Sequence, residues 1–189
     1  MTEKAIVHYT IDPAASTFTV QAFSVGLLSA FGHDPRIAIR DFRGDIRFSQ
    51  NDGRIEDAQL ELQIRAASLE NVDDISEKDR HDLERTMHGE VLESDRFQEI
   101  IYKASNVSIN ATGNRFWTVL NGELTLRGLT RPQPVSVRVV MNGDTLRAVG
   151  EFNIKQSSFG IAPVKVAGGA IRLKDELKCT FDIVARKQT

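Results

Sequence analysis

The chain has 189 residues, enough for one domain of ordinary size, and 41% of them are hydrophobic, which excludes an intrinsically disordered chain. With 24 Lys and Arg against 26 Asp and Glu, the formal net charge of −2 gives no general attraction to nucleic acids or anionic membranes. No stretch approaches the roughly 18 apolar residues of a membrane-spanning helix, so we expect no integral membrane association.

The start of the chain, Met1 to His8, lacks a basic segment followed by a long apolar run, which is the pattern of a secretory signal. We therefore expect a cytoplasmic protein. No internal repeat or interdomain linker is apparent, and residues 1–189 are taken as a single domain.

Most of the chain alternates apolar and polar residues, the period of strands with one buried and one solvated face. The alternation begins with Val7, Tyr9 and Ile11 and is cleanest near the C-terminus, from Ile171 to Ala185. These runs predict seven to nine strands in a mostly meander order, which favours an extended antiparallel barrel over a sandwich.

One run changes phase in its middle. Ile37 and Ile39 occupy odd positions, whereas Phe42 is even, and the residues after it keep the even phase. An extra residue near Arg40–Asp41 restores the phase and bends the strand, as a β-bulge does. Such bends allow a long strand to serve both walls of a closed barrel.

Turn signals separate the strands. Asn142–Gly143 is the most specific of them, because a tight two-residue hairpin turn needs positive φ at both positions. The sequence therefore predicts a hairpin turn centred on these two residues.

The segment from Ser76 to Glu90 departs from the strand pattern. Ser76 and Asp79 resemble a capping box, and Leu83, Met87 and Val91 recur at helical spacing. We expect one amphipathic helix, about residues 76–90, lying against the barrel. The apolar stretch Val25–Phe31 is read as a helix or a loop at the mouth of the barrel.

His81 and His88 lie seven residues apart on this predicted helix. Seven residues at 1.5 Å each place them roughly 10.5 Å apart, too far to share one metal ion easily. They are read as surface histidines that pair with Glu84 and Asp82, and no metal site is expected.

The pair His33–Asp34 is a candidate general acid and base. No Gly-x-Ser-x-Gly nucleophile motif accompanies it, and adjacent residues on an extended chain point in opposite directions. Cys179 falls among inward-facing residues, where a buried thiol is inert packing. We therefore expect no catalytic residue and keep an enzyme that uses His33–Asp34 as an alternative.

The sequence has no phosphate-binding glycine pattern and no aromatic residues on a basic face. We expect neither a cofactor nor a nucleic-acid partner. A barrel of about eight strands is either filled by side chains or holds one small apolar ligand, and periodicity leaves both open. The inward-facing candidates for ligand contact are Phe18, Val20, Ile46, Phe48, Leu62, Ile64, Leu124, Leu126, Val137, Val139, Phe152 and Phe181.

Four segments resemble landmarks of the YceI-like family, a bacterial family of lipocalin-like, polyisoprenoid-binding proteins. Residues Gly122–Pro132 (GELTLRGLTRP) are similar to its signature segment. Tyr9–Pro13, Phe42–Phe48 and Ser157–Ile161 resemble its opening strand, a second strand and a late loop, in the same order.

The resemblance implies an extended eight-stranded antiparallel barrel that holds a long isoprenoid chain, often in a homodimer. We expect a lipid-binding protein that carries or sequesters a polyisoprenoid or isoprenoid quinone-like lipid without chemistry. His33, Arg36 and Arg40 are the candidates for contact with the head group. A further alternative, besides the lipid carrier and the enzyme, is a packed barrel that acts as an interaction or stress-related scaffold.

Overall fold

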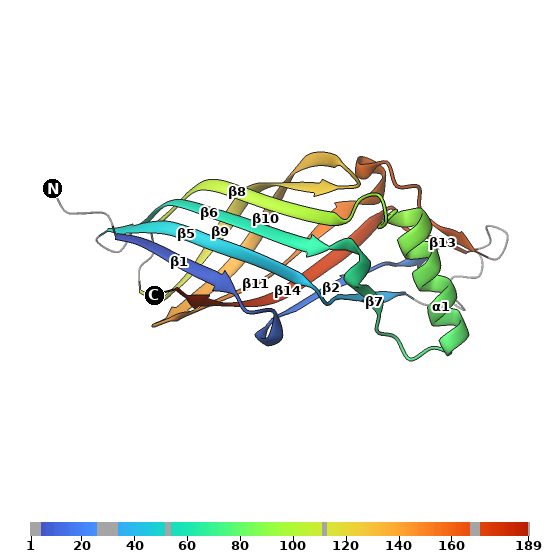
Figure 1. Ribbon diagram of the computed structural model, residues 1–189. Helices are drawn as coiled ribbons and strands as arrows, with labels where there is room; N and C mark the ends of the chain where they lie inside the picture. The colour runs from blue at the N-terminus through green and yellow to red at the C-terminus, as the bar shows by residue number, and fades with distance from the viewer. Residues whose placement is uncertain (1–4, 26–33, 52–53, 111–112, 167–170, 189) are drawn as a thin grey trace.

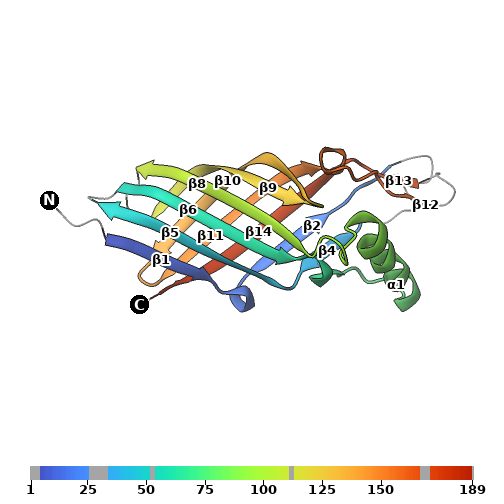
Figure 2. The ribbon, with the colours of Figure 1, turned by 45° about the horizontal axis from the view of Figure 1, so that its top comes forward.

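Long antiparallel strands close into an eight-stranded barrel in the computed structural model, which describes residues 5–25, 34–51, 54–110, 113–166 and 171–188 (Figures 1 and 2). Wall neighbours follow the order β1–β5–β6–β8–β9–β10–β11–β14, and β14 returns to β1. The predicted extended antiparallel barrel is thus confirmed. The wall strands are β1 (Ala5–Ile11), β5 (Phe42–Asn51), β6 (Arg54–Arg65), β8 (Glu99–Asn110), β9 (Arg115–Leu126), β10 (Leu129–Asn142), β11 (Thr145–Lys155) and β14 (Glu176–Lys187).

Three shorter strands lengthen the wall at one end: β2 (Thr17–Gln21), β4 (Arg36–Ile39) and β7 (Leu69–Asn71). β14 pairs with β1 near its C-terminal end and with β2 nearer its start, so β1 and β2 are two halves of one wall strand. A 3-10 turn, η1 (Pro13–Ala15), separates the halves. β4 and β7 continue the sheet from β2 in the same way.

The predicted phase change lies between β4 and β5. Strand β4 ends at Ile39, β5 begins at Phe42, and both residues are buried, while Arg40 and Asp41 between them are exposed. The N–H of Arg40 donates to the carbonyl of Ser68, and the N–H of Asp41 donates to the Ser68 hydroxyl. Ser68 belongs to the 3-10 turn η3 (Ala66–Ser68) between β6 and β7. The break between β4 and β5 therefore lies beside the break between β6 and β7.

Helix α1 (Glu77–Thr86) and a small sheet lie at the end of the barrel opposite to the start of β1 and the end of β14 (Figure 1). The small sheet pairs β13 (Ile171–Leu173) with β12 (Lys165–Val166) and β3 (Ser24–Val25). Of the predicted mouth segment Val25–Phe31, Val25 ends β3 and residues 26–31 lie outside the described residues. No helix in the described part of the chain has the length and apolar character to cross a bilayer.

The helix begins as the sequence predicts and ends with a wider turn. Ser76 is its N-cap, with its hydroxyl accepting the N–H of Asp79 at 3.1 Å. After Thr86 the chain continues as a π-helical turn, η4 (Met87–Val91), so the helical segment has 15 residues. Met87 is buried in the core, which confirms a helix that packs on the barrel.

The hairpin connection predicted within Asn142–Asp144 joins β10 to β11, but its two turn residues lie one position later than the Asn142–Gly143 pair. Asn142 is still in the strand and pairs with Thr145, so the turn residues are Gly143 and Asp144. Among the described residues, Gly143 has positive φ (56°) but Asn142 and Asp144 do not. The strand register, rather than the Asn–Gly preference, therefore sets the turn.

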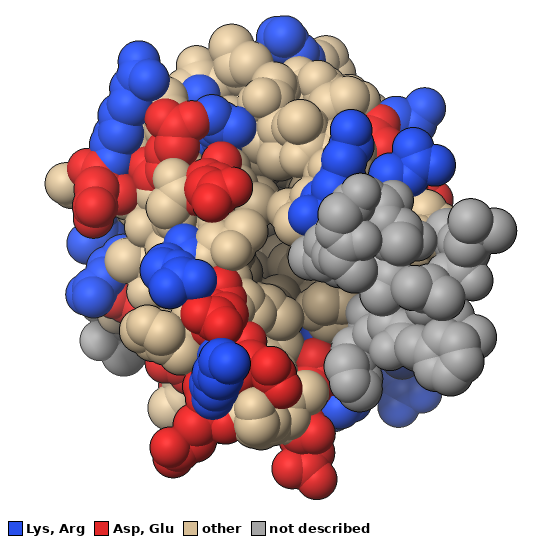
Figure 3. Space-filling view, turned by 90° about the vertical axis from the view of Figure 1, so that its right-hand side faces the viewer, with Lys and Arg blue, Asp and Glu red and all other residues tan. Residues whose placement is uncertain are grey.

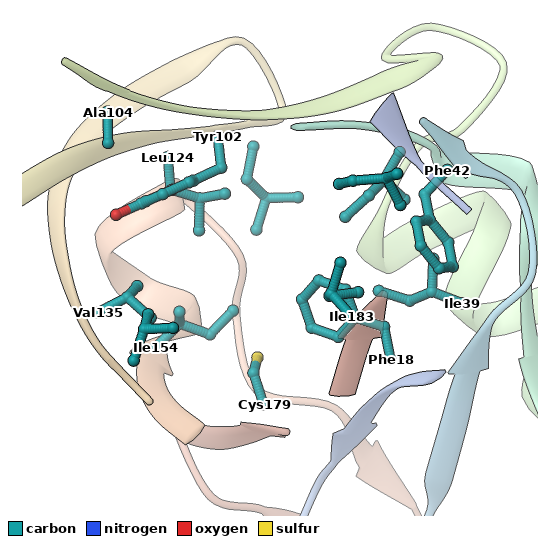
Figure 4. Packing of buried hydrophobic residues seen from close by; sticks show 14 of the residues in the cluster. Phe18, Ile39, Phe42, Tyr102, Ala104, Leu124, Val135, Ile154, Cys179 and Ile183 are labelled. Atoms are coloured by element: carbon teal, nitrogen blue, oxygen red, sulfur yellow. The ribbon is translucent and has the colours of Figure 1, made fainter. Parts of the chain in front are cut away.

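The core fills the interior from all sides of the wall, as Figure 4 shows for Phe18, Phe42, Leu124 and Ile183. Tyr102 is a buried residue that brings a hydroxyl into this layer. Its hydroxyl lies within hydrogen-bonding distance of the carbonyl oxygens of Leu120 (3.2 Å) and Gln133 (3.1 Å), between which its single hydrogen is donated. The ring lies over Gly122, where a side chain has no room: an added Cβ would stand 2.4 Å from the Tyr102 ring.

We predict that Gly122→Ala destabilises the protein by about 2–4 kcal/mol, because the new methyl group displaces Tyr102 from its hydrogen bonds. Gly89→Ala is the matched control, since a Cβ there meets nothing within 4 Å. It lies in the helical segment and is expected to be neutral or to stabilise by up to about 1 kcal/mol. Urea unfolding checks both, and equal midpoints for the two variants would contradict the packing of Tyr102 on Gly122.

Candidate ligand-binding interior

The interior of the barrel is lined almost entirely by apolar side chains. Every one of the twelve inward-facing residues predicted from the sequence belongs to the core or packs directly against it. Buried are Phe18, Phe48, Ile64, Leu124, Leu126, Val137 and Val139, and partly buried are Val20, Ile46, Leu62, Phe152 and Phe181. Their inward direction is therefore established, whereas their contact with a ligand stays a prediction.

Aromatic rings gather on two sides of this interior. Phe18, Phe152 and Phe181 form a group with ring centroids 6.0–6.5 Å apart, in the tilted and edge-on arrangements that aromatic pairs prefer. Tyr9 stacks on Phe48 with centroids 6.0 Å apart, and its hydroxyl donates to the carbonyl of Gly143. The rings present broad apolar surfaces without an unpaired polar group.

An apolar cavity of about 90 Å³ lies inside the barrel, towards the hairpins that join β5 to β6 and β10 to β11. A pocket of this size is smaller than the ~150 Å³ cavity that binds benzene and far below the roughly 300–1,000 Å³ of small-molecule sites. It suits the end of a hydrocarbon chain. Its lining residues are Ile46, Phe48, Ile55, Ala58, Gln59, Leu60, Ile109, Phe116, Thr118, Leu120, Val137, Val139, Met141, Leu146 and Ala148.

The opposite end of the barrel, beside α1, is hollowed at its centre (Figure 3). Uncharged residues border the hollow on the side away from the grey atoms, and charged side chains lie farther out (Figure 3). Arg127, in the turn between β9 and β10, forms an ion pair with Glu93, and its guanidinium also donates to the carbonyl of Gly160. Arg131 donates to the carbonyl of Ser158 at 3.1 Å. These two arginines tie the turn to the loops that flank it.

Two larger hollows lie on the outer wall. One of about 520 Å³ crosses β2, β9, β10, β11 and β14 and contains Trp117, whose exposed fraction is 71%, beside several threonines. The other, of about 750 Å³, is lined largely by charged and polar residues of β5, β6, β8 and β9. Neither offers the apolar enclosure of the interior.

Helix α1 covers the free edge of β7, which in the described part of the chain has one strand neighbour, β4. The Glu84 carboxylate accepts the backbone N–H of Asn71 at 2.9 Å, and the Arg80 guanidinium donates to the carbonyl of Asp73 at 2.9 Å. Helix side chains thus satisfy an edge that would otherwise be open to pairing. These two hydrogen bonds hold α1 at the hollowed end of the barrel.

Two of the three predicted head-group residues are exposed: Arg36 begins β4 and Arg40 follows its last residue. The Arg36 guanidinium is 3.1 Å from the Asp73 carboxylate, and that of Arg40 is 3.0 Å from Glu70. Burial opposes the ionisation of Asp73, yet hydrogen bonds from the Arg36 backbone, Asn71 and the Arg36 side chain lower its pKa overall. His33 lies outside the described residues, so the assignment of all three to a head group stays a prediction.

The structure corrects the interpretation of the helix histidines. Asp82 pairs with Arg85 at 2.8 Å and Glu84 binds Asn71, so neither acid is the partner that the sequence suggested. His81 is exposed as expected, but His88 is half-buried and its Nδ1 is enclosed. Helical periodicity alone gives no information about β7, which covers this side of the helix.

The described residues contain no group of three or more histidine, cysteine, aspartate and glutamate side chains that would hold a metal ion. Asp34, from the alternative acid–base pair, is exposed and accepts the backbone N–H of Ser24 at 2.7 Å. Cys179 is buried, and desolvation raises the pKa of its thiol to about 12. The thiol is therefore protonated in the folded protein, as the sequence predicted for a core residue.

We predict that Cys179 resists alkylation by iodoacetamide at about pH 8 in the folded protein and reacts on unfolding, because only the thiolate attacks. Burial also raises the pKa of Tyr102 to about 12. Both pKa values are higher folded than unfolded, so stability is unaffected below about pH 9 and falls as the pH rises towards 12. Urea midpoints measured across this pH range test how steeply stability falls with pH, and Cys179→Ala should make that fall shallower. Rapid iodoacetamide labelling of the folded chain would refute the burial of Cys179.

A family model described as the YceI-like domain matches residues 9–185. Among solved structures, a protein of Burkholderia cenocepacia called BcnA has a TM-score of 0.69 at 19% identity, covering 92% of this chain and 98% of that one. A polyisoprenoid binding domain from Saccharophagus degradans, implicated in plant cell wall breakdown, has a TM-score of 0.67 at 12% identity, covering 98% and 100%.

A YceI protein from Campylobacter jejuni has a TM-score of 0.59 at 10% identity, covering 81% of this chain and 85% of its own. At these identities the likeness concerns the fold. Comparison with curated proteins gives no match.

Proposed function

The chain belongs to the YceI-like family, and we propose that it binds a long apolar chain, a polyisoprenoid or an isoprenoid quinone-like lipid, inside its barrel. In this proposal it acts as a carrier or sequestering protein and does no chemistry on the lipid. The observation that carries the proposal is the apolar cavity inside the barrel, of whose fifteen lining residues only Gln59 and Thr118 are polar. The likeness in fold to a domain described as polyisoprenoid binding supports the same conclusion.

The affinity for such a lipid comes from apolar surface removed from water, at roughly 25 cal/mol per Å². The cavity provides a dry end for the chain, and the hollow beside α1 provides an entrance (Figure 3). Between them lie the aromatic rings and aliphatic side chains of the core, which move apart to admit a chain of several isoprene units.

The size of the cavity favours a second candidate, a packed barrel that serves as an interaction scaffold. A volume of about 90 Å³ is too small for a whole ligand. A core that is filled by side chains leaves only a small space of this kind. The two candidates differ in whether the core opens for a lipid, which binding measurements decide directly.

We predict that Ala148→Phe abolishes binding of a long-chain polyprenol, because the new ring occupies the cavity that Ala148 lines. Ala14→Phe, at an exposed position in η1, is the matched control and should bind as the unaltered protein does. Gel filtration with the labelled polyprenol measures retention, and circular dichroism verifies the fold. If Ala148→Phe folds and retains the lipid fully, the cavity is not where the chain lies.

We also propose a homodimer, which the resemblance to the YceI-like family implies, and a cytoplasmic location. Light scattering during gel filtration measures the mass in solution, and fractionation of the source cells locates the protein. A monomer, or a periplasmic protein, would contradict these two proposals without affecting the proposed ligand.

A further inference from the structure

Helix α1 and the π-helical turn that follows it carry two stripes of side chains. Leu83 and Val91 pack against the core, in which Met87 is buried. Arg80, Glu84 and His88 follow each other at intervals of four residues, the spacing of neighbours on a helix surface. This second group is called the polar stripe below.

The polar stripe contains two enclosed nitrogen atoms without a hydrogen-bond partner, Nε of Arg80 and Nδ1 of His88. No other buried side-chain nitrogen or oxygen atom of the described residues lacks a hydrogen-bond partner. Elsewhere buried polar groups are bonded: the Gln156 amide, for example, donates to the carbonyl of Lys174 at 2.9 Å. A buried polar atom without a partner costs about 1–3 kcal/mol, so two on one stripe need a physical reason.

His88 is half-buried and stands beside residues of the apolar core. The buried residues Met87 and Leu92 flank it, with exposed fractions of 9% and 7%, and both belong to the core. Its turn is π-helical, a form that is rare in proteins overall but occurs often at functional sites. The helix stands at the end of the barrel that is hollowed (Figures 1 and 3).

The chemistry of the polar stripe selects an oxygen acceptor without charge. Nε of Arg80 carries a hydrogen that can only be donated, and a neutral imidazole donates from one of its nitrogens. Glu84 lies between the two, and α1 carries four acidic residues against three basic ones. No excess positive charge is present for a phosphate, whereas a carbonyl or hydroxyl oxygen satisfies both nitrogens.

We propose that Arg80 and His88 form the polar end of the binding site and hydrogen-bond the uncharged carbonyl or hydroxyl oxygen at the head of the apolar ligand. This inference rests on the proposed function and adds the part of the ligand that the apolar interior cannot recognise. It moves head-group contact from Arg36 and Arg40 to the helical segment of residues 77–91.

The test compares two probes that differ in the head group: a ubiquinone with four isoprene units, and squalene, a headless isoprenoid hydrocarbon. His88→Leu should weaken quinone binding about tenfold, the effect of one hydrogen bond, and leave squalene binding unchanged. His81→Leu, the same substitution at an exposed position of the same helix, should change neither. Arg80→Met, with Arg85→Met as its exposed control, should repeat the pattern.

The outcomes separate the inference from the proposed function. If His88→Leu and Arg80→Met bind both probes as the unaltered protein does, the inference alone is wrong. If the unaltered protein binds neither probe, both are wrong. Tighter binding of a polyprenyl phosphate than of the quinone, lost in Arg80→Met, overturns the uncharged acceptor.

A measurement on the unaltered protein covers the case in which a variant fails to fold. Histidine labelled with ¹⁵N reports each imidazole by NMR, and the His88 Nδ1 resonance should shift when the quinone binds but not when squalene binds. The His81 signal serves as the internal reference. A His88 signal that responds equally to both probes contradicts the contact.

Discussion

Strand β14 closes the barrel because it pairs with three neighbours at once. β11 lies along most of its length, β1 pairs with it near the C-terminal end, and β2 pairs with it nearer the start. In this register Cys179, Phe181 and Ile183 all face inward, since side chains alternate strictly along a strand. A slip by one residue would expose them and bring Lys178 and Asp182 into the core, so the apolar interior depends on this pairing.

The interior that results offers apolar surface, and the polar groups that the described residues bring to it are bonded or neutral. The hydroxyl groups of Tyr9 and Tyr102 are bonded to backbone carbonyls, and the thiol of Cys179 stays protonated. The ion pairs of the wall, such as Arg147 with Asp182 and Lys178 with Glu151, project from its outer side. What remains inside is apolar surface, which recognises a hydrocarbon by burial rather than by direction.

Specificity then has to come from the ends of the barrel. The cavity near Phe116 and Ala148 is apolar, whereas the other end carries α1, whose Glu84 bonds the β7 residue Asn71 and whose Arg80 bonds Asp73 just beyond β7. An elongated ligand with one apolar and one polar end matches this polarity. The helix therefore covers a strand edge, and in the proposal made above it also supplies the polar groups that bind the head of the ligand.

The sequence predicted the side-chain directions well, because period-two alternation reports which face of a strand is buried. It located the bend at Arg40–Asp41 for the same reason, from a change of phase. The number of strand segments was harder to predict, since η1 and η3 interrupt wall strands without changing their neighbours. Ile109 and Phe116 line the cavity yet were missed, as they flank a hairpin where the alternating run is short.

His88 could not be interpreted from the sequence, because its enclosure depends on where the helix docks. Spacing on the helix places it next to Glu84, but the Glu84 carboxylate is taken by the backbone of Asn71, thirteen residues earlier in the chain. A contact between a helix and a strand edge leaves no periodic signal. The packing of the helix on the barrel, which the sequence does not reveal, thus determines the enclosure of His88.

Native mass spectrometry of freshly purified protein shows whether the barrel holds a long isoprenoid chain. We expect a discrete adduct that organic extraction releases, with fragment masses spaced by isoprene units. A mass equal to that of the bare chain, unchanged after incubation with polyprenols and isoprenoid quinones, would contradict this expectation and favour a packed barrel.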